Sequence, residues 1–297
     1  MTTIIRKLSS EIDQSLNFVF PSGSGSYFEA RLVLRDGHKA VVYISSQDGC
    51  SQGCRMCYLT SLRQKKMTNA MLEDILFQAE TVISALLDLD IAVKNLHFNF
   101  MARGDVISNI DLVRSWSDVE LGLSSLAQRK NISANAAILV STIFPKKIGF
   151  EYIENLFESR ITNIYYSYYS KKDSFRRRWL PNSQSVEESC LFLKKFHESS
   201  GKRPRFHFCF IDGQNDSMED LDDLIDVASD FSPFFDVNIV RFNPPPGSNY
   251  AESPEERVLK NVEYLRKYLP SSNVKIISRV GYDVKASCGM FLEDVNV

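Results

Sequence analysis

The sequence predicts an α/β protein whose core is a partial (β/α)6 barrel preceded by a short N-terminal β-hairpin. Three observations lead to this prediction. Segments rich in strand-forming residues alternate with helical segments about six times along the chain. The strand segments are largely apolar, as is typical of a parallel sheet that helices cover. With 297 residues, of which 44% are hydrophobic, the chain can also bury a large core.

The beginning of the chain differs in composition from the rest. Residues 1–26 are expected to form an N-terminal segment that ends in a flexible joint, because Pro21 opens a run of alternating serine and glycine. The core domain is then expected to cover residues 27–297.

A hairpin is expected at the start of this core domain. Residues 27–35 and 38–45 are rich in strand formers, and Asp36 with Gly37 supplies turn chemistry between them. The second arm leads directly into a cysteine-rich loop. Ligands of parallel sheets bind at the carboxyl ends of the strands, so this loop is expected at the functional edge.

The remaining elements follow from the alternation. Further strands are expected at residues 95–101, 136–142, 163–169, 205–211 and 237–242. Helices are expected at residues 69–89, 185–199, 218–229 and 254–268.

The cysteine-rich loop carries Cys50, Cys54 and Cys57 in the spacing C-x3-C-x2-C. Three cysteines on one short loop can hold three irons of a cubane 4Fe-4S cluster, because each thiolate binds one iron. The fourth iron then has no protein ligand, and the amino and carboxylate groups of S-adenosylmethionine (SAM) can chelate it. This arrangement resembles the radical SAM superfamily, and the resemblance implies an enzyme that uses both cofactors.

Two other uses of these thiols are disfavoured. Zinc usually takes four ligands, often as two separated pairs, and no second cysteine or histidine pair of that spacing occurs in the chain. A disulfide framework does not suit six cysteines in 297 residues, three of them on one loop, with no apolar signal segment before them. An oxygen-sensitive cluster and free thiols suit a reducing compartment, so we expect a cytoplasmic protein with no membrane association.

Composition gives no general preference for nucleic acid. With 35 basic and 37 acidic residues the formal net charge is −2, so any RNA contact has to use local patches. Residues 63–66 and 176–179 are two basic segments that could hold phosphates, and Trp179 could stack a base. Both segments are equally typical of a solvated charged face.

Further motifs stand along the chain in a fixed order. They are Ser-Ser-Gln-Asp-Gly-Cys at 45–50, Met-Ala-Arg-Gly-Asp at 101–105, Val-Ser-Thr at 140–142, Asp-Gly-Gln-Asn-Asp at 212–216, Phe-Asn-Pro-Pro-Pro-Gly at 242–247 and Ala-Ser-Cys-Gly at 286–289. Together with the cysteine loop, over roughly residues 27–290, they resemble the RlmN/Cfr group of radical SAM methyltransferases, which modify carbon 2 or carbon 8 of an adenine in ribosomal RNA.

The resemblance implies a 4Fe-4S cluster on the three cysteines and a set of SAM-binding residues. Gly104 and Asp105 stand where the family has Gly-Glu, whose carboxylate binds the ammonium group of SAM, and Tyr169 replaces a family histidine. The implied SAM-binding residues are Gly104, Asp105, Ser141, Ser167, Tyr169 and Asn243.

The resemblance also implies the catalytic residues. The cysteine corresponding to Cys288 is methylated by SAM, a 5′-deoxyadenosyl radical removes a hydrogen atom from that methyl, and the resulting radical attacks the adenine. Such a route is needed because an sp2 ring carbon is a poor nucleophile. Glu29 matches the family's proton-accepting glutamate. Outside the resemblance, Cys288 is typical of a small buried residue and Glu29 of a solvated strand face.

Two departures from the family stand out. Tyr43 replaces the cysteine that resolves the covalent enzyme–RNA adduct through a disulfide. Cys209, on an expected strand, is a candidate substitute, whereas Cys190 lies in a helical segment. The family also has a long helical RNA-binding domain where this sequence has residues 1–26, so we expect this accessory domain to be lacking.

The sequence therefore predicts a radical SAM methyltransferase acting on an adenine of RNA, either tRNA or rRNA, with a flavodoxin- or ferredoxin-type reductant. The alternative is a radical SAM enzyme that acts on a nucleotide, peptide or small molecule without cysteine-mediated methyl transfer, which Tyr43 favours. A non-catalytic binding module is a third reading, and the cysteine triad, Gly104 with Asp105, and Cys288 argue against it.

Overall fold

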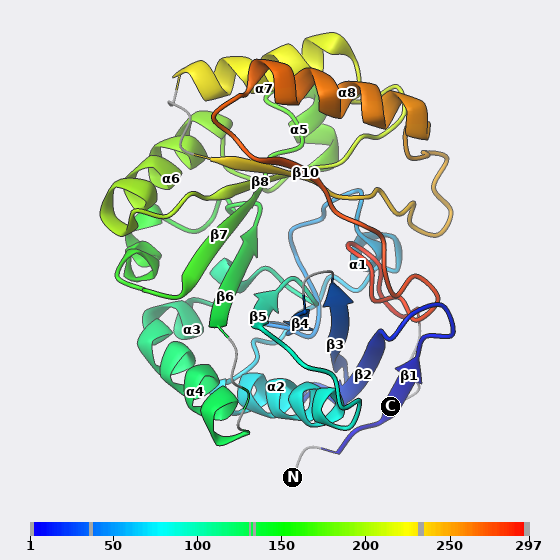
Figure 1. The fold of residues 1–297 in the computed structure, drawn as a ribbon, viewed down its shortest axis with the longest axis vertical. Helices are drawn as coiled ribbons and strands as arrows, with labels where there is room; N and C mark the ends of the chain where they lie inside the picture. The colour runs from blue at the N-terminus through cyan, green and yellow to red at the C-terminus, as the bar shows by residue number, and fades with distance from the viewer. Residues whose placement is uncertain (1–2, 36–37, 131, 133–134, 231–234, 294–297) are drawn as a thin grey trace.

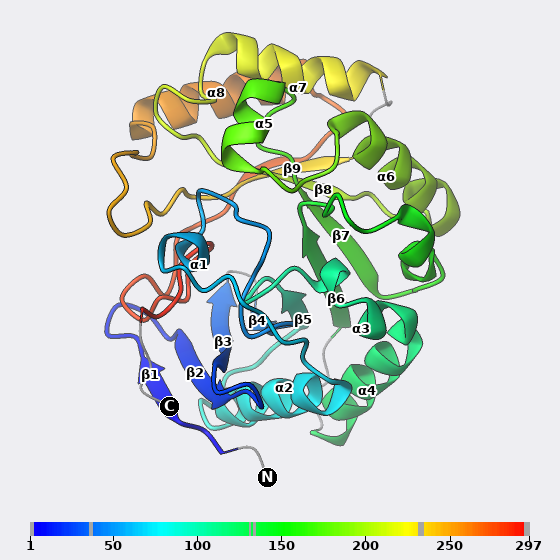
Figure 2. The same cartoon turned by 180° about the vertical axis from the view of Figure 1, so that it is seen from behind.

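The computed structural model describes residues 3–35, 38–130, 132, 135–230 and 235–293. Within these ranges the strands form one ten-stranded sheet whose spatial order follows the chain from β1 to β10. The pairs from β1 to β4 are antiparallel, and those from β4 to β10 are parallel. Figures 1 and 2 show the sheet curving around an interior, with the long helices outside it.

The strands are β1 (Arg6–Ser9), β2 (Leu16–Pro21), β3 (Tyr27–Arg35), β4 (Lys39–Tyr43), β5 (Asn95–Phe100), β6 (Asn135–Thr142), β7 (Thr162–Ser167), β8 (Arg205–Phe208), β9 (Asp236–Ile239) and β10 (Val274–Ile276). The helices are α1 (Tyr58–Ser61), α2 (Leu72–Leu87), α3 (Ile110–Arg114), α4 (Trp116–Arg129), α5 (Asp173–Trp179), α6 (Val186–Ser200), α7 (Met218–Asp230) and α8 (Glu255–Tyr268). Short 3-10 helices cover Val106–Ser108, Phe150–Tyr152 and Glu154–Phe157.

The predicted α/β class and the first hairpin are confirmed. β3 and β4 pair antiparallel, and the parallel part of the sheet begins at β4. The predicted turn residues Asp36 and Gly37 lie outside the described residues. The four predicted helices correspond to α2, α6, α7 and α8, whereas α3, α4, α5 and β10 were not anticipated.

The N-terminal segment differs from the prediction. Instead of a separate piece ending in a flexible joint, it adds β1 and β2 to the antiparallel edge of the sheet. Phe18 and Phe20 drive this, because both are buried in the main core. The serine run forms the turn between β2 and β3, where the hydroxyls of Ser22 and Ser24 donate to Asp48 Oδ2 at 2.7 and 2.5 Å.

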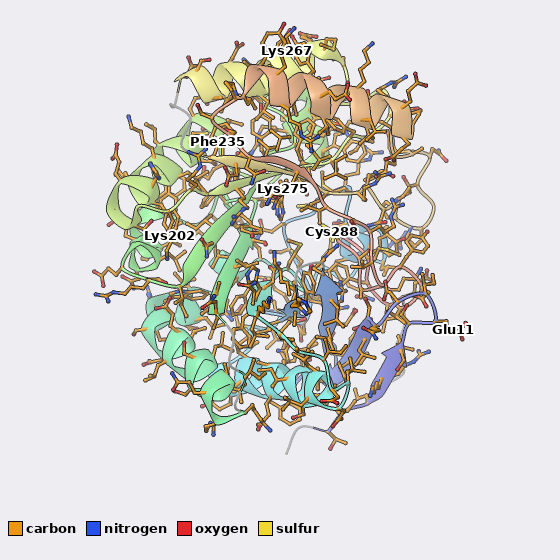
Figure 3. The ribbon with its side chains drawn as sticks, in the orientation of Figure 1. Glu11, Lys202, Phe235, Lys267, Lys275 and Cys288 are labelled. Carbon is orange, nitrogen blue, oxygen red and sulfur yellow. The ribbon has the colours of Figure 1, made fainter. Side chains whose placement is uncertain are left out.

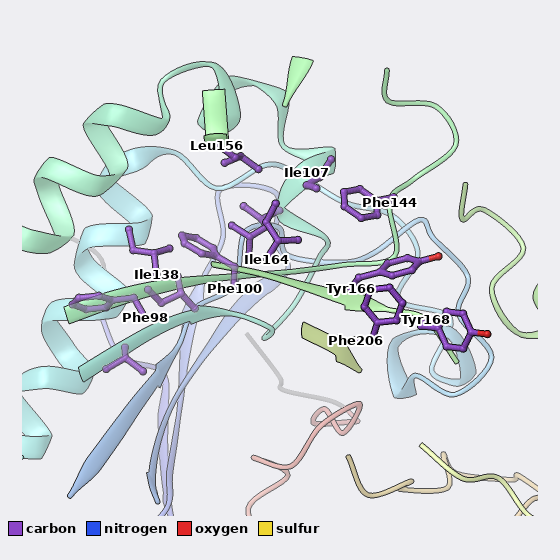
Figure 4. Close-up of a cluster of buried hydrophobic side chains, with 14 of the residues drawn as sticks. Phe98, Phe100, Ile107, Ile138, Phe144, Leu156, Ile164, Tyr166, Tyr168 and Phe206 are labelled. Atoms are coloured by element: carbon purple, nitrogen blue, oxygen red, sulfur yellow. The ribbon is translucent and has the colours of Figure 1, made fainter. Parts of the chain in front are cut away.

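Side chains alternate between the two faces of the parallel strands, as the strand period of two requires. In β5, Phe98 and Phe100 point outward into the apolar core beneath the helices, where Figure 4 shows them among side chains of neighbouring strands. His97 and Asn99 line a cavity inside the barrel. The strands are thus not apolar on both faces, and the interior is free to carry polar chemistry. No helix in the described ranges is long and apolar enough to span a bilayer.

Candidate functional site

One cavity at the carboxyl ends of the parallel strands collects residues that lie far apart in the sequence. We call it the cysteine cavity. Its lining contains ten of the eleven predicted site residues: Cys50, Cys54, Cys57, Gly104, Asp105, Ser141, Ser167, Tyr169, Asn243 and Cys288. The eleventh, Glu29, lies outside this lining.

The cysteine loop joins β4 to α1 and is held by its backbone. The amide of Cys50 donates to the carbonyl of Gln64 at 3.1 Å, and the amide of Cys57 donates to the carbonyl of Cys54 at 3.1 Å. Glycine is required at position 49, because a Cβ there would lie 1.9 Å from the carbonyl oxygen of Lys66. The loop is therefore folded back tightly on residues 64–66, with its thiols facing the cavity.

Burial makes this set of thiols suited to a bound metal cluster. It raises the pKa of Cys50 to about 12, with a further contribution from Cys57, and raises the pKa of Cys57 to about 11. The pKa of Cys54 is also raised, by burial and by the other two thiols. Three thiolates need a cationic partner in such a site.

The arrangement of the three thiols helps to distinguish a site for a metal cluster from a site for a single metal ion. Among the described residues, no group of three or more His, Cys, Asp or Glu side chains is close enough to hold one metal ion. A 4Fe-4S cluster requires less convergence, because each thiolate binds a different iron. The three thiols of one loop, all in the lining of the same cavity, thus fit a cluster.

Gly104 follows β5 in a backbone conformation that disfavours other residues. Its φ is +94°, and a Cβ there would lie 2.7 Å from Cβ of Gln47 and 2.8 Å from Oγ of Ser46. Because residue 104 has no side chain, the end of β5 can pack closely against the segment that leads into the cysteine loop.

The carboxylate of Asp105 already has protein donors. Its Oδ2 accepts from Oγ1 of Thr142 and from the amide of Ile143, both at 3.0 Å, and its Oδ1 accepts from the amide of Ile107 at 3.2 Å. Burial nevertheless raises the pKa of Asp105 to about 6, because these bonds only partly offset the desolvation. Asp105 thus joins the ends of β5 and β6 at the cavity wall.

The amide side chain of Asn243 is engaged on both sides. Its Nδ2 donates to the carbonyl of Cys288 at 2.8 Å, and its Oδ1 accepts from Nε of Arg279 at 2.8 Å. Asn243 therefore positions the loop that carries Cys288. Ser141 donates from Oγ to Oδ1 of Asn99 at 3.2 Å.

Cys288 also lines a second cavity, inside the barrel, which we call the interior cavity. The two cavities share Met101, Val240, Arg241, Asn243 and Cys288 in their linings. Cys288 thus stands at the boundary between them. Burial raises the pKa of the Cys288 thiol.

The structure separates the candidate partners of Cys288. Cys209 lines the cysteine cavity, and burial followed by the charge of Cys288 raises its pKa, so the two thiols are near each other. Cys190 is buried on α6 in the main core. Tyr43 lines the interior cavity together with Cys288.

The comparisons with known proteins agree with this geometry. No family model matches the chain. It is 25% identical to the probable dual-specificity RNA methyltransferase RlmN of Lachnospira eligens, over 98% of this chain and 79% of that protein. It is 26% identical to the dual-specificity RNA methyltransferase RlmN of Wolinella succinogenes, over 99% of this chain and 81% of that one.

The fold has a solved counterpart. A radical SAM methyltransferase from Sphaerobacter thermophilus superimposes with a TM-score of 0.82 at 19% identity, covering 99% of this chain and 82% of that one. In sequence and in fold, the chain resembles the RlmN/Cfr-like group of the radical SAM superfamily. The similarity extends along nearly the whole chain.

In this RlmN-like chain Glu29 forms a buried ion triad with two arginines that sequence reasoning missed. Its Oε2 lies 3.1 Å from Nη2 of Arg31, and its Oε1 lies 3.1 Å from Nη1 of Arg103. All three side chains are at most 1% exposed. Arg103 stands inside the Met-Ala-Arg-Gly-Asp motif, which was its one signal in the sequence.

The triad connects the two loops of the RlmN-like site. Arg31 donates to the carbonyls of Ser287 and Met290 at 3.5 and 2.7 Å, and these residues flank Cys288. Arg103 donates twice to the carbonyl of Asp48, at 2.9 and 2.7 Å, just before the cysteine loop. One carboxylate therefore holds both loops through its arginines.

Two residues of one basic segment, Arg176 and Trp179, are not available as RNA contacts. Arg176 is buried and donates to the carbonyls of Tyr168 and Gln184, at 2.9 and 2.7 Å. Trp179 is 1% exposed, so it cannot stack a base. The prediction for this part of residues 176–179 is wrong, because the helical face that carries both residues packs inward.

Removing the charge of Glu29 tests the triad. We expect Glu29→Gln to lower the free energy of unfolding by about 3–5 kcal/mol, because two buried guanidinium groups lose their counter-charge. Glu80→Gln is the matched control, since Glu80 pairs with Lys130 at the surface and its loss should cost at most about 1 kcal/mol. Urea unfolding measures both, and equal losses would contradict the role of the triad.

Proposed function

We propose that the chain is a radical SAM methyltransferase that modifies an adenine of RNA, with Cys288 as the methyl carrier. The observation that carries this proposal is the position of Cys288 in the lining of both cavities. A carrier has to reach the methyl donor on one side and the acceptor on the other. A cysteine enclosed by one cavity would meet only one of them.

In this proposal Cys50, Cys54 and Cys57 hold the 4Fe-4S cluster, and SAM binds in the rest of the cysteine cavity. When bound, the two groups supply a transferable methyl group and radical chemistry that removes a hydrogen atom. Gly104, Ser141, Ser167 and Tyr169 contribute to the walls of the SAM site. Asp105 contributes a carboxylate to the same walls. Hydrogen bonds from the hydroxyl of Thr142 and the amide of Ile143 hold this carboxylate in place.

Cys288 then does two things. Its sulfur would accept one methyl group from SAM bound in the cysteine cavity, with the thiol proton released to solvent. The methylated side chain next presents its carbon to the interior cavity, where the target base binds. Asn243, through its bond to the Cys288 carbonyl, keeps this loop in place during both steps.

The RNA part of the proposal is supported by the relatives, which are named as RNA methyltransferases. A base has to leave its stack to enter a cavity inside a barrel, so an unpaired or loop adenine of tRNA or rRNA is the expected target. A flavodoxin- or ferredoxin-type reductant would supply electrons, in a cytoplasmic setting.

Glu29 takes a different part in this proposal from the proton acceptor expected from the sequence. Both of its oxygens are committed to arginines, and it also accepts from the amide of Leu292 at 3.3 Å. We assign it the positioning of the Cys288 loop.

A second function has one observation in its favour. Tyr43 stands where the family has its resolving cysteine, and its side chain lines the interior cavity. A phenol cannot form a disulfide, so the chain could act on a different substrate without methyl transfer through Cys288.

Transfer of labelled methyl from SAM into RNA tests the leading function. The anaerobically reconstituted enzyme should label an adenine-containing RNA, and Cys288→Ala should abolish labelling while its iron content stays unchanged. Cys190→Ala, a core cysteine outside both cavities, should retain labelling. Absence of label from every RNA class would contradict the function.

Cys209 gives a further test. If the thiolate of Cys209 attacks the sulfur of Cys288 in the adduct, an S–S bond forms as the bond from that sulfur to the transferred methylene carbon breaks. The methylene carbon keeps the bonding electron pair and takes a proton, which makes it the methyl group of the product. Cys209→Ala should then accumulate a covalent protein–RNA adduct, visible on a denaturing gel, that Cys190→Ala does not form. Unchanged turnover of Cys209→Ala would remove Cys209 from the mechanism.

A further inference from the structure

The interior cavity differs in character from the cysteine cavity. It has a volume of about 290 Å³ and is lined by the inward-facing positions of the parallel strands. Many of those positions carry polar or charged side chains, including Lys39 on β4, His97 on β5, Tyr165 on β7 and Arg205 on β8, beside the apolar Val41 and Leu139. A barrel of this size could have been filled with apolar residues. The polar lining therefore indicates a ligand.

The charges in this lining have one sign. Arg35, Lys39, Arg205 and Lys275 all line the cavity, and no described residue of its lining is an aspartate or glutamate. Lys39 and Arg35 are opposite each other across the β3–β4 pair, and Lys39 and Arg205 begin their strands. The cationic end thus lies at the amino ends of the strands, away from the cysteine loop.

Among the described residues, no carboxylate forms an ion pair with any of these four cations. Arg35 donates to the carbonyl of Ser278, and Arg205 donates to the hydroxyl of Tyr165 at 3.3 Å, both neutral acceptors. The pKa of Lys39 is lowered by burial and then by the charges of Arg205, Lys275 and Arg35.

Two acids near the cavity, within the described ranges, are paired with other arginines. Asp236, opposite Arg205 in the sheet, is 3.1 Å from Nε of Arg203. Glu252 pairs with the cavity's other two arginines, Arg241 and Arg279. A cluster of like charges without counter-charges favours a bound anion.

Two histidines in the lining of the cavity are neutral. Burial and the neighbouring cations lower the pKa of His97 to about 4, and burial followed by Arg205 lowers that of His207 to about 3. Both imidazoles are therefore uncharged at neutral pH and present hydrogen-bonding nitrogens. His207 lies 3.4 Å from Nδ2 of Asn238. Such groups suit the polar edge of a base or a sugar.

We propose that the interior cavity is the substrate site and that its cationic end binds a phosphate group of the nucleotide whose base faces Cys288. This inference rests on the proposed function, because it identifies the chemistry of the acceptor side. A phosphate there would gain from Arg35, Lys39, Arg205 and Lys275 together, and the neutral region would leave the base next to the methyl carrier.

Binding of adenosine 5′-monophosphate and of adenosine tests the phosphate site directly. The holoenzyme is first saturated with S-adenosylhomocysteine, so that an adenine ring cannot occupy the SAM site. The monophosphate should then bind at least about tenfold more tightly than adenosine, and the difference should shrink as salt rises. Equal binding of the two would overturn the proposal.

Two exposed lysines form a matched pair for this experiment. Figure 3 labels Lys275, which lines the interior cavity, and Lys267, which lies on the outer helix α8. Lys275→Ala should reduce the preference for the monophosphate about fivefold or more, whereas Lys267→Ala removes the same charge and should leave it unchanged. Equal effects of the two variants would mean a general charge effect and would contradict the site.

A third ligand distinguishes a phosphodiester of an RNA chain from the phosphate of a free nucleotide. A trimer of adenosine without terminal phosphates offers only phosphodiesters, and binding of this trimer that depends on Lys275 points to an RNA chain. Binding of the monophosphate alone would support the site but assign it to a free nucleotide, which would contradict RNA as substrate. Methyl transfer to RNA without any phosphate preference would overturn the site and leave the proposed function intact.

Discussion

The buried pairing of Glu29 with Arg31 and Arg103 is the interaction on which the arrangement of the site depends. Charges at most 1% exposed are stable only when each has a close partner, so the three side chains constrain one another. Through Arg31 they hold the segment around Cys288, and through Arg103 they hold the entry to the cysteine loop. The two loops are more than 200 residues apart in sequence, since Cys57 and Cys288 belong to opposite ends of the chain. A shared counter-ion keeps them facing one cavity.

This constraint gives Cys288 its position between two chemically different spaces. On one side the thiols of the cysteine loop, buried and with raised pKa values, require a cationic partner. On the other side a group of cations faces a neutral polar region. A methyl carrier has to serve two such spaces, and in the proposed mechanism the short movement of one side chain connects them. The antiparallel strands β1 to β3 support this arrangement, because β3 supplies both Glu29 and Arg31.

The cysteine loop could be predicted from the sequence because its chemistry depends on the local spacing of three cysteines. The later motifs, taken in their order along the chain, were enough to predict ten of the eleven site residues that the structure places in one cavity. Glu29 could not be placed, since its partners come from β3 and the loop after β5. The interior cations were missed for another reason. His97 and Asn99 alternate with Phe98 and Phe100, and the alternation was read only as an apolar strand. The strand β2 was missed because the serine run after it has the composition of a linker.

The central claim is that Cys288 receives a methyl group within the cysteine cavity. The most direct measurement is mass spectrometry of the peptide that contains Cys288, after anaerobic incubation of the cluster-loaded protein with SAM and a reductant in the absence of RNA. The account predicts a gain of one methyl group on Cys288, with Cys209 and Cys190 unmodified. An unmodified Cys288 alongside production of 5′-deoxyadenosine would contradict it, because the protein would then cleave SAM without using its cysteine as a carrier.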